Sequence, residues 1–469
     1  MTLQEILDLI ATGEPSQVIT ALKNKSIHVP AWADGVKGLR AEYDPRLHPV
    51  MDKGRYPDIV TESGVVKVSR IALDFQRLAV KRMSELCCGI PVRREYAAEN
   101  DRQKQVARYI EGIYDAVCID DVNTERLNML FAGCEVMTMW YAVEQPHSLY
   151  GFDAPLKLRC RNFTPMIGDE LWPLFDEYGD MVALSIGYQR KVGQNTVSYF
   201  ECYTAERHIK WGSEGGTWAV VTDERITLGK IPAIYMWRPT PIWEQTSTVV
   251  EDMEWALSRN GNYIRENSKP LLAVFADEVI QYGQEKSPNK EFRQVAQFPQ
   301  DAKLEYVTWQ GATDNLKYHV ETLRSMFFTL LQLPDWSYEK MSQQALSGES
   351  RKQMFIDAQL KVRDESGRIV KFLRRETNVI KAFLKAMLPD DWAADIDALP
   401  VESKITPFMI ADEAERITNL MNANGGEPII SQRESIAMYG HSRDVDRTLQ
   451  EIQEQQSQKL DIFQQEPAE

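Results

Sequence analysis

The chain has 469 residues, of which 43% are hydrophobic and 26% charged, and its formal net charge is −15. This length and balance predict a soluble globular protein of two to four domains. A protein that grips nucleic acid by neutralising phosphates needs a basic surface, so the overall charge argues against a tight DNA binder. The charge still permits a surface past which DNA slides.

The cysteines match no zinc-ligand spacing, and five of the six lie in apolar runs, which is typical of small core residues in a reducing, cytosolic compartment. They are Cys87, Cys88, Cys118, Cys134, Cys160 and Cys202. Residues 1–10 carry acids early and lack a basic region, so no signal peptide is expected. No window approaches ~18 uninterrupted apolar residues, so no membrane span is expected.

The first third of the chain alternates helical patterns with irregular stretches. Residues 2–24 predict short amphipathic helices, and 26–68 predict loops with short strands. Residues 69–88 predict a helix that ends at Gly89. Its expected apolar face is formed by Ile71, Phe75, Leu78, Arg82 and Leu86. Two more helices are expected over 101–117 and 121–132, followed by a strand over 134–143.

Residues 156–237 are rich in short apolar, aromatic and β-branched runs, separated by Gly/Asn/Asp turn signals. This pattern predicts antiparallel hairpins. A helix follows over 244–268, with Glu251, Asp252 and Glu254 near its start, where acids suit the helix dipole. Residues 270–312 predict a small insert, in which 271–275 and 303–309 are strands and 283–290 is a polar loop.

Residues 314–388 predict a helix, an irregular connection and a much longer helix. In the first helix one face carries Leu316, Val320, Leu323, Phe327 and Leu330. Pro334 ends it, because proline disfavours α geometry at the preceding residue. Residues 349–387 would extend roughly 58 Å as a helix at ~1.5 Å per residue, with Gly367 as an expected bend. A helix of this length more often spans an assembly than a single domain.

The last part of the chain is helical and acidic. Residues 407–423 predict a helix, Ser431 and Glu434 fit a capping box, and 444–460 predict a polar helix. Residues 401–469 hold thirteen acids and six Lys or Arg, so they contribute −7 of the −15.

Motifs for catalysis, phosphate binding and metal binding are absent from the sequence. The six histidines are scattered singly, and Asp444 and Asp446 fit a solvated helix better than a metal site. Ser347-Gly-Glu-Ser350 lacks a preceding strand and a histidine partner, so a loop with a helix N-cap is the better interpretation. We therefore expect no enzyme activity, no catalytic residue, no metal and no cofactor.

Several weak motifs occur together in a fixed order. They are Leu86-Cys-Cys-Gly-Ile-Pro91, Gly133 before a β-rich segment, the helix 243–267, Ala345-Leu-Ser-Gly-Glu-Ser-Arg-Lys352, and Pro428-Ile-Ile-Ser431 followed by an acidic helix. In this order and spacing, over about 65–455, the chain resembles the portal protein of tailed bacteriophages of the long-tailed, siphophage type.

The resemblance implies an α+β portal fold that forms a ring oligomer, usually of twelve subunits. The implied parts are an N-terminal wing, a helical-hairpin stem, a small α/β clip, a channel (tunnel) loop, a long wing helix with a linker, and an acidic helical crown and tail. In this chain the wing would cover 1–243 (β-rich at 156–237), the stem 244–268 with 313–332, and the clip 269–312. The channel loop would cover 333–348, the long wing helix with its linker 349–404, and the crown and tail 405–469.

The family's function implies a channel at one capsid vertex, through which a terminase packages double-stranded DNA that is later ejected. The implied partners are further copies of the chain, DNA, the terminase large subunit, a head-completion adaptor, and the major capsid and scaffolding proteins, without a membrane. The protein would assemble in the bacterial host cytoplasm and reside in the virion.

Two groups of residues are candidates for facing DNA. On the stem they are Glu251, Asp252 and Glu254, whose charge would keep DNA from binding the wall tightly. In the loop they are Trp336, Tyr338, Glu339, Lys340, Met341, Gln343 and Gln344. Lys340 with its flanking aromatics could touch phosphates and sugars, or the aromatics could pack on the same or a neighbouring subunit, and both interpretations stay open.

Two other classes of protein remain as alternatives. One is a different oligomeric capsid or tail component, such as an adaptor or scaffold, although these are usually shorter. The other is a polymer-acting enzyme whose acids gather only in the fold, which a metal requirement would reveal.

Overall fold

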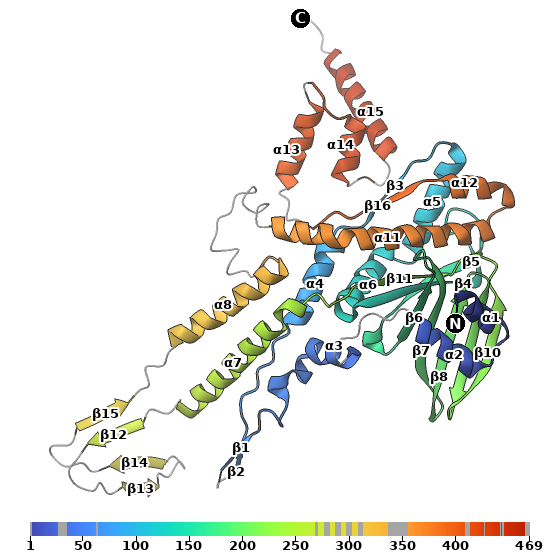
Figure 1. The fold of residues 1–469 in the computed structure, drawn as a ribbon. Coiled ribbons are helices and arrows are strands. Elements are labelled where there is room, and N and C mark those ends of the chain that lie inside the picture. The colour runs from blue at the N-terminus through green and yellow to red at the C-terminus, as the bar shows by residue number, and fades with distance from the viewer. Residues whose placement is uncertain are drawn as a thin grey trace, which may run out of the picture. The chain divides into compact units, whose positions relative to one another are not determined.

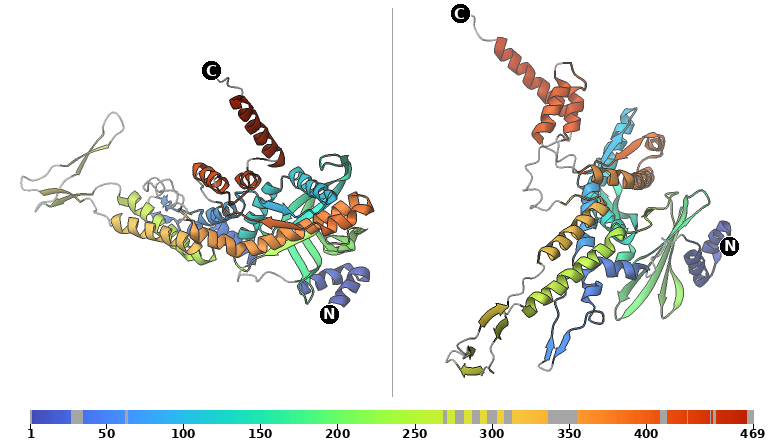
Figure 2. Two further views of the ribbon diagram at one scale, coloured as in Figure 1. Left: turned by 90° about the horizontal axis from the view of Figure 1, so that it is seen from above. Right: turned by 60° about the vertical axis from the view of Figure 1, so that its left-hand side comes forward.

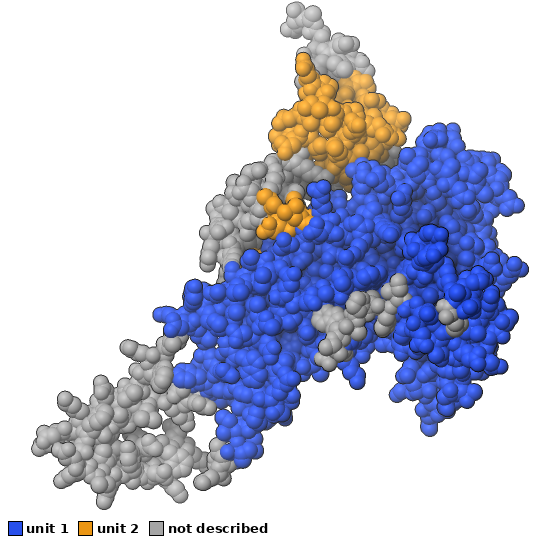
Figure 3. Space-filling view, in the orientation of Figure 1, with its two compact units in different colours: residues 1–334, 361–407 blue, residues 335–360, 408–469 orange. Residues whose placement is uncertain are grey.

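The computed structural model describes residues 2–26, 35–61, 64–267, 271–275, 282–286, 292–296, 303–307, 313–335, 355–408, 413–425, 427–440, 442 and 445–464. The chain forms two compact units (Figure 3). Unit 1 comprises residues 1–334 and 361–407, and unit 2 comprises residues 335–360 and 408–469. The fold of the described residues mixes helices with several small sheets, as predicted.

A five-stranded antiparallel meander forms the larger sheet of unit 1. Its strands are β6 (Glu170–Phe175), β7 (Met181–Val192), β8 (Asn195–Thr204), β9 (Arg207–Glu214) and β10 (Thr217–Arg225), in the order β10-β9-β8-β7-β6. Sequential strands pair through tight turns, as Val192 with Asn195 at the β7–β8 turn. The predicted hairpins are therefore confirmed for this region.

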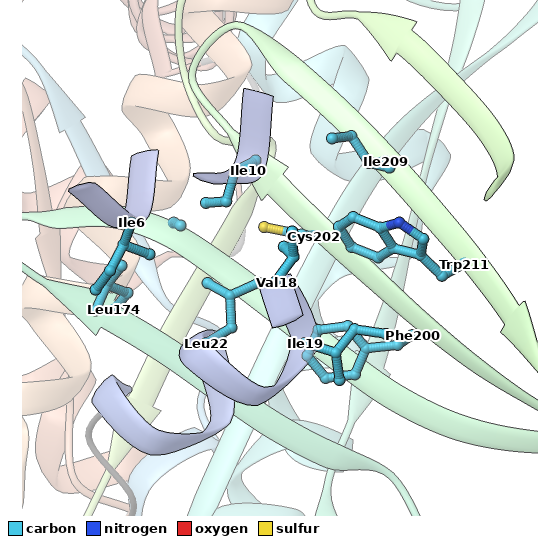
Figure 4. Packing of buried hydrophobic residues seen from close by; sticks show 11 residues of the cluster. Ile6, Ile10, Val18, Ile19, Leu22, Leu174, Phe200, Cys202, Ile209 and Trp211 are labelled. Atoms are coloured by element: carbon cyan, nitrogen blue, oxygen red, sulfur yellow. The ribbon is translucent and has the colours of Figure 1, made fainter. Parts of the chain in front are cut away.

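Two N-terminal helices cover one face of this sheet. Helices α1 (Leu3–Thr12) and α2 (Pro15–Lys25) place Ile6, Val18 and Leu22 against Phe200 and Trp211 (Figure 4). The amphipathic helices expected from 2–24 are confirmed. Burial of this apolar face, rather than helix propensity alone, holds such short helices in place.

A second sheet of three strands has the order β11-β4-β5, with β4 at Glu135–His147, β5 at Ala154–Phe163 and β11 at Ala233–Trp237. The buried side chains Met137 and Tyr235 of this sheet and Leu184 and Ile186 of β7 belong to one hydrophobic cluster. That cluster joins the two sheets into one core. The 3₁₀ turn η3 (Pro165–Ile167) lies between β5 and β6.

The helices of unit 1 include α3 (Gly35–Tyr43), α4 (Phe75–Cys88), α5 (Asp101–Ala116), α6 (Ile119–Gly133) and α12 (Ala393–Ala398), together with α11 (Ile356–Met387) from Lys361 onward. The short elements around them are η1 (Pro45–Leu47), η2 (Pro49–Met51), η5 (Asp390–Trp392), and the paired strands β3 (Arg93–Tyr96) and β16 (Val401–Lys404). Helix α11 runs as one helix through Gly367. The predicted stretch 349–354 lies outside the described residues.

Helix α4 corrects one prediction. It begins at Phe75 and not at residue 69, and its buried residues include Ala79, Val80 and Met83 instead of the face through Leu78 and Arg82. Residues 69–74 carry no helix, because side chains of another helix bind their backbone N–H groups, as described below. Ahead of them, β1 (Ile59–Thr61) and β2 (Gly64–Val66) form a hairpin.

Two antiparallel helices project from the body of unit 1 (Figures 1 and 2). They are α7 (Ser247–Asn267), which follows η4 (Glu244–Thr246), and α8 (Thr313–Leu331). Between them β12 (Leu271–Phe275) pairs with β15 (Lys303–Val307), and β13 (Tyr282–Lys286) pairs with β14 (Phe292–Ala296). The strands expected at 271–275 and near 303 are confirmed. The polar loop expected over 283–290 is wrong in its first part, which forms β13.

The C-terminal part of unit 2 contains α13 (Glu413–Asn424), α14 (Gln432–Tyr439) and α15 (Val445–Gln464). The predicted capping box of Ser431 and Glu434 is confirmed at the start of α14, which ends at Gly440 in a left-handed conformation. None of the side chains described in these three helices is buried. Across the described part of the chain, no helix is apolar over enough of its length to cross a membrane.

Candidate functional site

The start of α7 is fixed by α3. The indole of Trp243, fully buried just before α7, donates to Glu42 Oε2 at 2.9 Å, and Ser247 Oγ donates to the same oxygen at 2.8 Å. The ring of Tyr43 stacks on that of Trp243 with 5.4 Å between centroids. One carboxylate thus joins α3 to the first turn of α7.

A row of polar side chains along α7 binds the extended segment 69–73. The backbone N–H groups of Ser69, Ile71 and Leu73 donate to Asn262 Oδ1 at 2.5 Å, Ser258 Oγ at 2.8 Å and Glu254 Oε1 at 2.7 Å. Two residues of extended chain rise about 6.6 Å, and four residues of helix rise about 6 Å. The two spacings match, so every second N–H meets one side chain per helical turn.

The extended segment approaches α7 closely at Gly261. A Cβ atom at this position would lie 2.7 Å from Ser69 Oγ, which is too close for any side chain. On the same stretch Arg265 donates to the Lys67 carbonyl, and Asn262 also donates to the Tyr56 hydroxyl. The residues that anchor α7 thus share one side of the helix.

The β1–β2 hairpin is held firmly at its base. Arg70 Nη1 lies 2.8 Å from Asp58 Oδ1, and both side chains are largely buried. Asp58 also accepts from Val68 N at 3.1 Å, and Arg70 donates to the Tyr56 carbonyl at 2.6 Å. The strands themselves are exposed, with Val60 80% and Val65 65% accessible.

Glu254 forms the buried centre of the α7 anchor and is 1% exposed. Its Oε1 lies 2.6 Å from His48 Nδ1, while His48 Nε2 lies 2.8 Å from the Glu42 carbonyl oxygen. Burial alone would lower the pKa of His48, but the hydrogen bond and charge of Glu254 outweigh it, so the pKa lies above its usual value. Since both ring nitrogens face acceptors, the geometry suits the imidazolium form.

The prediction that Glu254 lies with Glu251 and Asp252 on a channel face is therefore wrong for Glu254. Its carboxylate is enclosed by its own chain and held by His48 and the Leu73 N–H. Glu251 and Asp252 are exposed. Asp252 Oδ2 lies 3.0 Å from His319 Nε2, which joins α7 to α8, and Glu251 lines a cavity of about 310 Å³ together with Arg55.

The C-terminal end of α8 is also fixed. Phe327 and Phe328 are buried and pack with Phe75, whose ring centroid lies 4.8 Å from that of Phe327. Gln332 takes a left-handed conformation with φ of 55°, and Leu333 N donates back to the Phe328 carbonyl at 3.0 Å. Helix α8 therefore ends in a defined turn just before the predicted channel loop.

The last residue of α8 meets α11 at Lys361, whose ammonium donates to the Leu331 carbonyl. Burial, together with the charge of Arg238, lowers the pKa of Lys361 to about 8. Arg238 in turn lies 2.9 Å from Glu365 on the same helix. The predicted loop residues Trp336, Tyr338, Glu339, Lys340, Met341, Gln343 and Gln344 lie outside the described residues.

Helix α11 is joined to α6 by a buried ion pair. Arg126 Nη1 and Nη2 lie 2.7 and 3.0 Å from the two carboxylate oxygens of Glu376, and both side chains are at most 2% exposed. The Trp140 indole donates to the same carboxylate at 3.1 Å, and the Arg126 guanidinium lies 4.7 Å from the Phe372 ring centroid. Every charged atom of this pair thus has a partner.

Sequence reasoning missed His48, Ser258 and the buried role of Glu254. The polar positions 254, 258 and 262 recur every four residues, so they form a row on one side of α7. That spacing is visible in the sequence, but the extended segment that binds the row lies far away in the chain. Within the described residues no group of three His, Cys, Asp or Glu could hold a metal ion.

Comparison with known proteins gives the following results. The family described as "Phage portal protein, SPP1 Gp6-like" matches residues 44–460. No curated protein matches the chain. Among solved structures, a chain of "Neck of empty GTA particle computed with C6 symmetry" is similar at 11% identity and a TM-score of 0.38, covering 77% of this chain and 89% of that one. A chain of "Virion of native gene transfer agent (GTA) particle" is similar at 10% identity and a TM-score of 0.39, covering 90% and 98%.

The two structural likenesses are too distant to carry an argument about function. The family match spans most of the chain and includes α7, α8 and α11. The chain therefore belongs to the family of SPP1 Gp6-like phage portal proteins.

Proposed function

We propose that this chain assembles into a ring at one vertex of a phage capsid and forms the channel through which double-stranded DNA is packaged and later ejected. Family membership over 44–460 supports this function. The observation that carries it is the paired stem, α7 and α8, which is fixed at its body end by buried polar and aromatic contacts. A head-to-tail interface that closes on itself turns such subunits into a ring, and we expect twelve of them.

The stem would supply the channel wall, with Glu251 and Asp252 among its exposed acids. Duplex DNA carries about one negative charge per ~1.7 Å of its axis, so an acidic wall repels the phosphates and lets the duplex slide. In the loop that follows α8, Lys340 flanked by Trp336 and Tyr338 is the candidate for brief contacts with DNA. The two roles are separable, because one set repels phosphates and the other attracts them.

The proposed partners follow from this place in the virion. Residues 269–312 form the clip, which would dock the terminase large subunit during packaging and a head-completion adaptor afterwards. The wing and the acidic crown, residues 405–469, would meet the major capsid and scaffolding proteins. Assembly would take place in the bacterial host cytoplasm. No catalytic role is assigned to the chain.

The first test is the mass of the purified protein in solution, followed by negative-stain images. A ring of about twelve chains with a central hole is the expected result. A dimer or tetramer without a hole would contradict the proposal. If the chain stays monomeric, adding the capsid and scaffolding proteins must produce the ring, and a persistent monomer under those conditions would also contradict it.

A second test addresses the channel wall directly. The double substitution Glu251→Lys and Asp252→Lys should slow DNA packaging without changing ring mass, since lysines would bind passing phosphates. Unchanged packaging would remove these residues from the wall. The matched control replaces two exposed acids of β10, Asp223 and Glu224, by lysine.

A further inference from the structure

The α6–α11 pair places opposite charges on opposite sides of one subunit. Arg126 and Glu376 face each other between the two helices. Each helix turns about 100° per residue, so the direction of every other side chain follows from these two. We use them as reference points for the faces that point away from the contact.

The outer face of α11 is basic. Arg363, Gly367, Lys371 and Arg374 all lie within about 40° of the direction opposite Glu376, and all four are exposed. None of the three cations forms an ion pair with another residue that the structure describes. Asp364 lies beside Arg363 on this face, so Lys371 and Arg374 carry most of its positive charge.

The carboxylates that share cavities with this face leave its charge uncompensated. Glu95, Asp397 and Glu402 line a cavity with Arg374. Lys404 lies 2.6 Å from Glu95 and 4.0 Å from Glu402, and Lys385 lies 2.8 Å from Asp397. Asp176 and Glu177 line another cavity with Lys371 without forming an ion pair with it. The basic face is therefore a surface that an acidic partner would neutralise.

The outer face of α6 is acidic. Asp120 and Asp121 lie about 120° and 140° from Arg126 around the helix, and both are exposed, as is Glu125. Asp115 extends the patch at the end of α5. Glu125 accepts a hydrogen bond from Asn162 at 2.6 Å, and none of the four acids forms an ion pair within the described part of the chain. Acids at a helix start suit the dipole, but Glu125 and Asp115 lie beyond that effect.

We propose that the acidic face of α6 in one subunit docks against the basic face of α11 in the next copy of the chain. This proposal rests on the ring proposed above and names the surfaces that close it. Because the two faces point away from each other, the contact is head-to-tail, and each subunit offers one face to each neighbour. The charges are complementary, which sets the register of such an interface.

Gly367 at the centre of the basic face fits a close contact. Glycine inside a helix is less stable than alanine, and a Cβ atom here would meet nothing in its own chain within 4 Å. Its own subunit therefore gives no packing reason for the glycine. In the ring, it lets the neighbouring helix approach the α11 backbone between Arg363 and Lys371.

The test is a charge exchange in the full-length chain. The variants Lys371→Glu/Arg374→Glu and Asp120→Lys/Asp121→Lys should each raise the protein concentration needed for half-maximal ring formation by about tenfold or more, because like charges then face each other. Combining all four substitutions should restore the wild-type concentration. Ring formation is measured by native mass spectrometry and negative staining. Raising the salt concentration should weaken wild-type ring formation but should leave the unfolding midpoint of the subunit unchanged.

The control variant Lys191→Glu/Arg225→Glu makes the same charge change on exposed positions of β7 and β10, and it should assemble normally. If either charge reversal prevents folding, as judged by circular dichroism, the neutral variant Lys371→Gln/Arg374→Gln is used instead. Its ring formation should no longer depend on the salt concentration. If Lys371→Glu/Arg374→Glu assembles like the wild type, or if the combined variant does not recover, this interface is overturned. The proposal that the chain forms a ring would still stand. A wild-type chain that forms no ring would instead overturn the proposed function, and the interface with it.

Discussion

The two stem helices are fixed in different ways. Helix α7 carries the polar row Glu254, Ser258 and Asn262, which binds backbone N–H groups over three turns. Helix α8 has buried side chains only in its last turns, at Phe327, Phe328 and Leu331, and none among residues 314–326. Polar contacts with the backbone therefore run along α7, whereas the buried apolar contacts of α8 lie at one end of the helix. The difference predicts which substitutions unfold the subunit and which leave it intact.

The largest effect is expected for Glu254→Ala. It leaves the buried His48 Nδ1 and the Leu73 N–H without their acceptor, and removing one partner of such a buried pair costs about 3–5 kcal/mol. Chemical denaturation followed by tryptophan fluorescence gives the change in the free energy of unfolding. The matched control Glu251→Ala, on the exposed side, should stay within about 0.5 kcal/mol. A small effect at Glu254 would remove the contrast between the helices.

Phe327→Ala tests the apolar end of α8. Deleting a fully buried phenylalanine costs about 3–4 kcal/mol through lost burial and the cavity left beside Phe75. The same denaturation experiment measures it. Met326→Ala, one residue earlier and 44% exposed, is the control and should be nearly neutral. If both variants behave alike, α8 is not anchored as described.

Asn262→Ala should have a smaller effect. It removes the acceptor of the Ser69 N–H, and an unsatisfied buried group costs about 1–3 kcal/mol. Hydrogen exchange at Ser69 should also quicken, while exchange at Ile71 changes less. Asn260→Ala, on the same helix, serves as control. Equal protection at Ser69 in the variant would contradict the row of contacts.

The pH dependence of the α7 anchor depends on His48. Because its pKa is raised in the folded chain, its contribution is fully present below the unfolded value of about 6.5 and is lost as the pH rises through the folded pKa. The stability difference between wild type and His48→Gln should therefore shrink as the pH rises above about 6.5. Melting temperatures measured in one buffer series give this difference. A constant difference would mean that His48 stays neutral.

The smallest effect is expected for Tyr318→Ser on the outer part of α8, where the ring is 73% exposed. The free energy of unfolding of the isolated subunit should change by less than about 0.5 kcal/mol. A loss of more than about 1 kcal/mol would show that the outer half of α8 is fixed within its own subunit. In that case the contrast with α7 would fail.

Local patterns in the sequence predicted helix α7 and the hairpins of the larger sheet well. The helix expected over 244–268 is α7 at 247–267, and the hairpins after residue 156 are β6 to β10. Both depend on periodicity and turn residues, which neighbouring positions determine. The expected face of α8, however, is only half-buried at Leu316, Val320 and Leu323, and Leu330 is exposed.

The errors arose where distant segments compete for the backbone. The spacing of Ile71, Phe75 and Leu78 suits a helix, yet residues 69–73 are extended because α7 supplies acceptors for their N–H groups. Likewise Glu254 looked like its exposed neighbours Glu251 and Asp252, and only the position of His48 makes it a buried ion-pair partner. Residues that lie some 200 positions apart in the sequence leave no local pattern that reveals their contact.

The attachment of the β1–β2 hairpin to α7 has a mechanical consequence. The segment after the hairpin is hydrogen-bonded to α7 at Ser69, Ile71 and Leu73. The base of the hairpin is held by the ion pair of Asp58 and Arg70. We therefore expect the hairpin to move together with α7. We expect a tilt of α7 to move the exposed valines Val60 and Val65 with it, so fluorescent labels on the hairpin should report movement of α7.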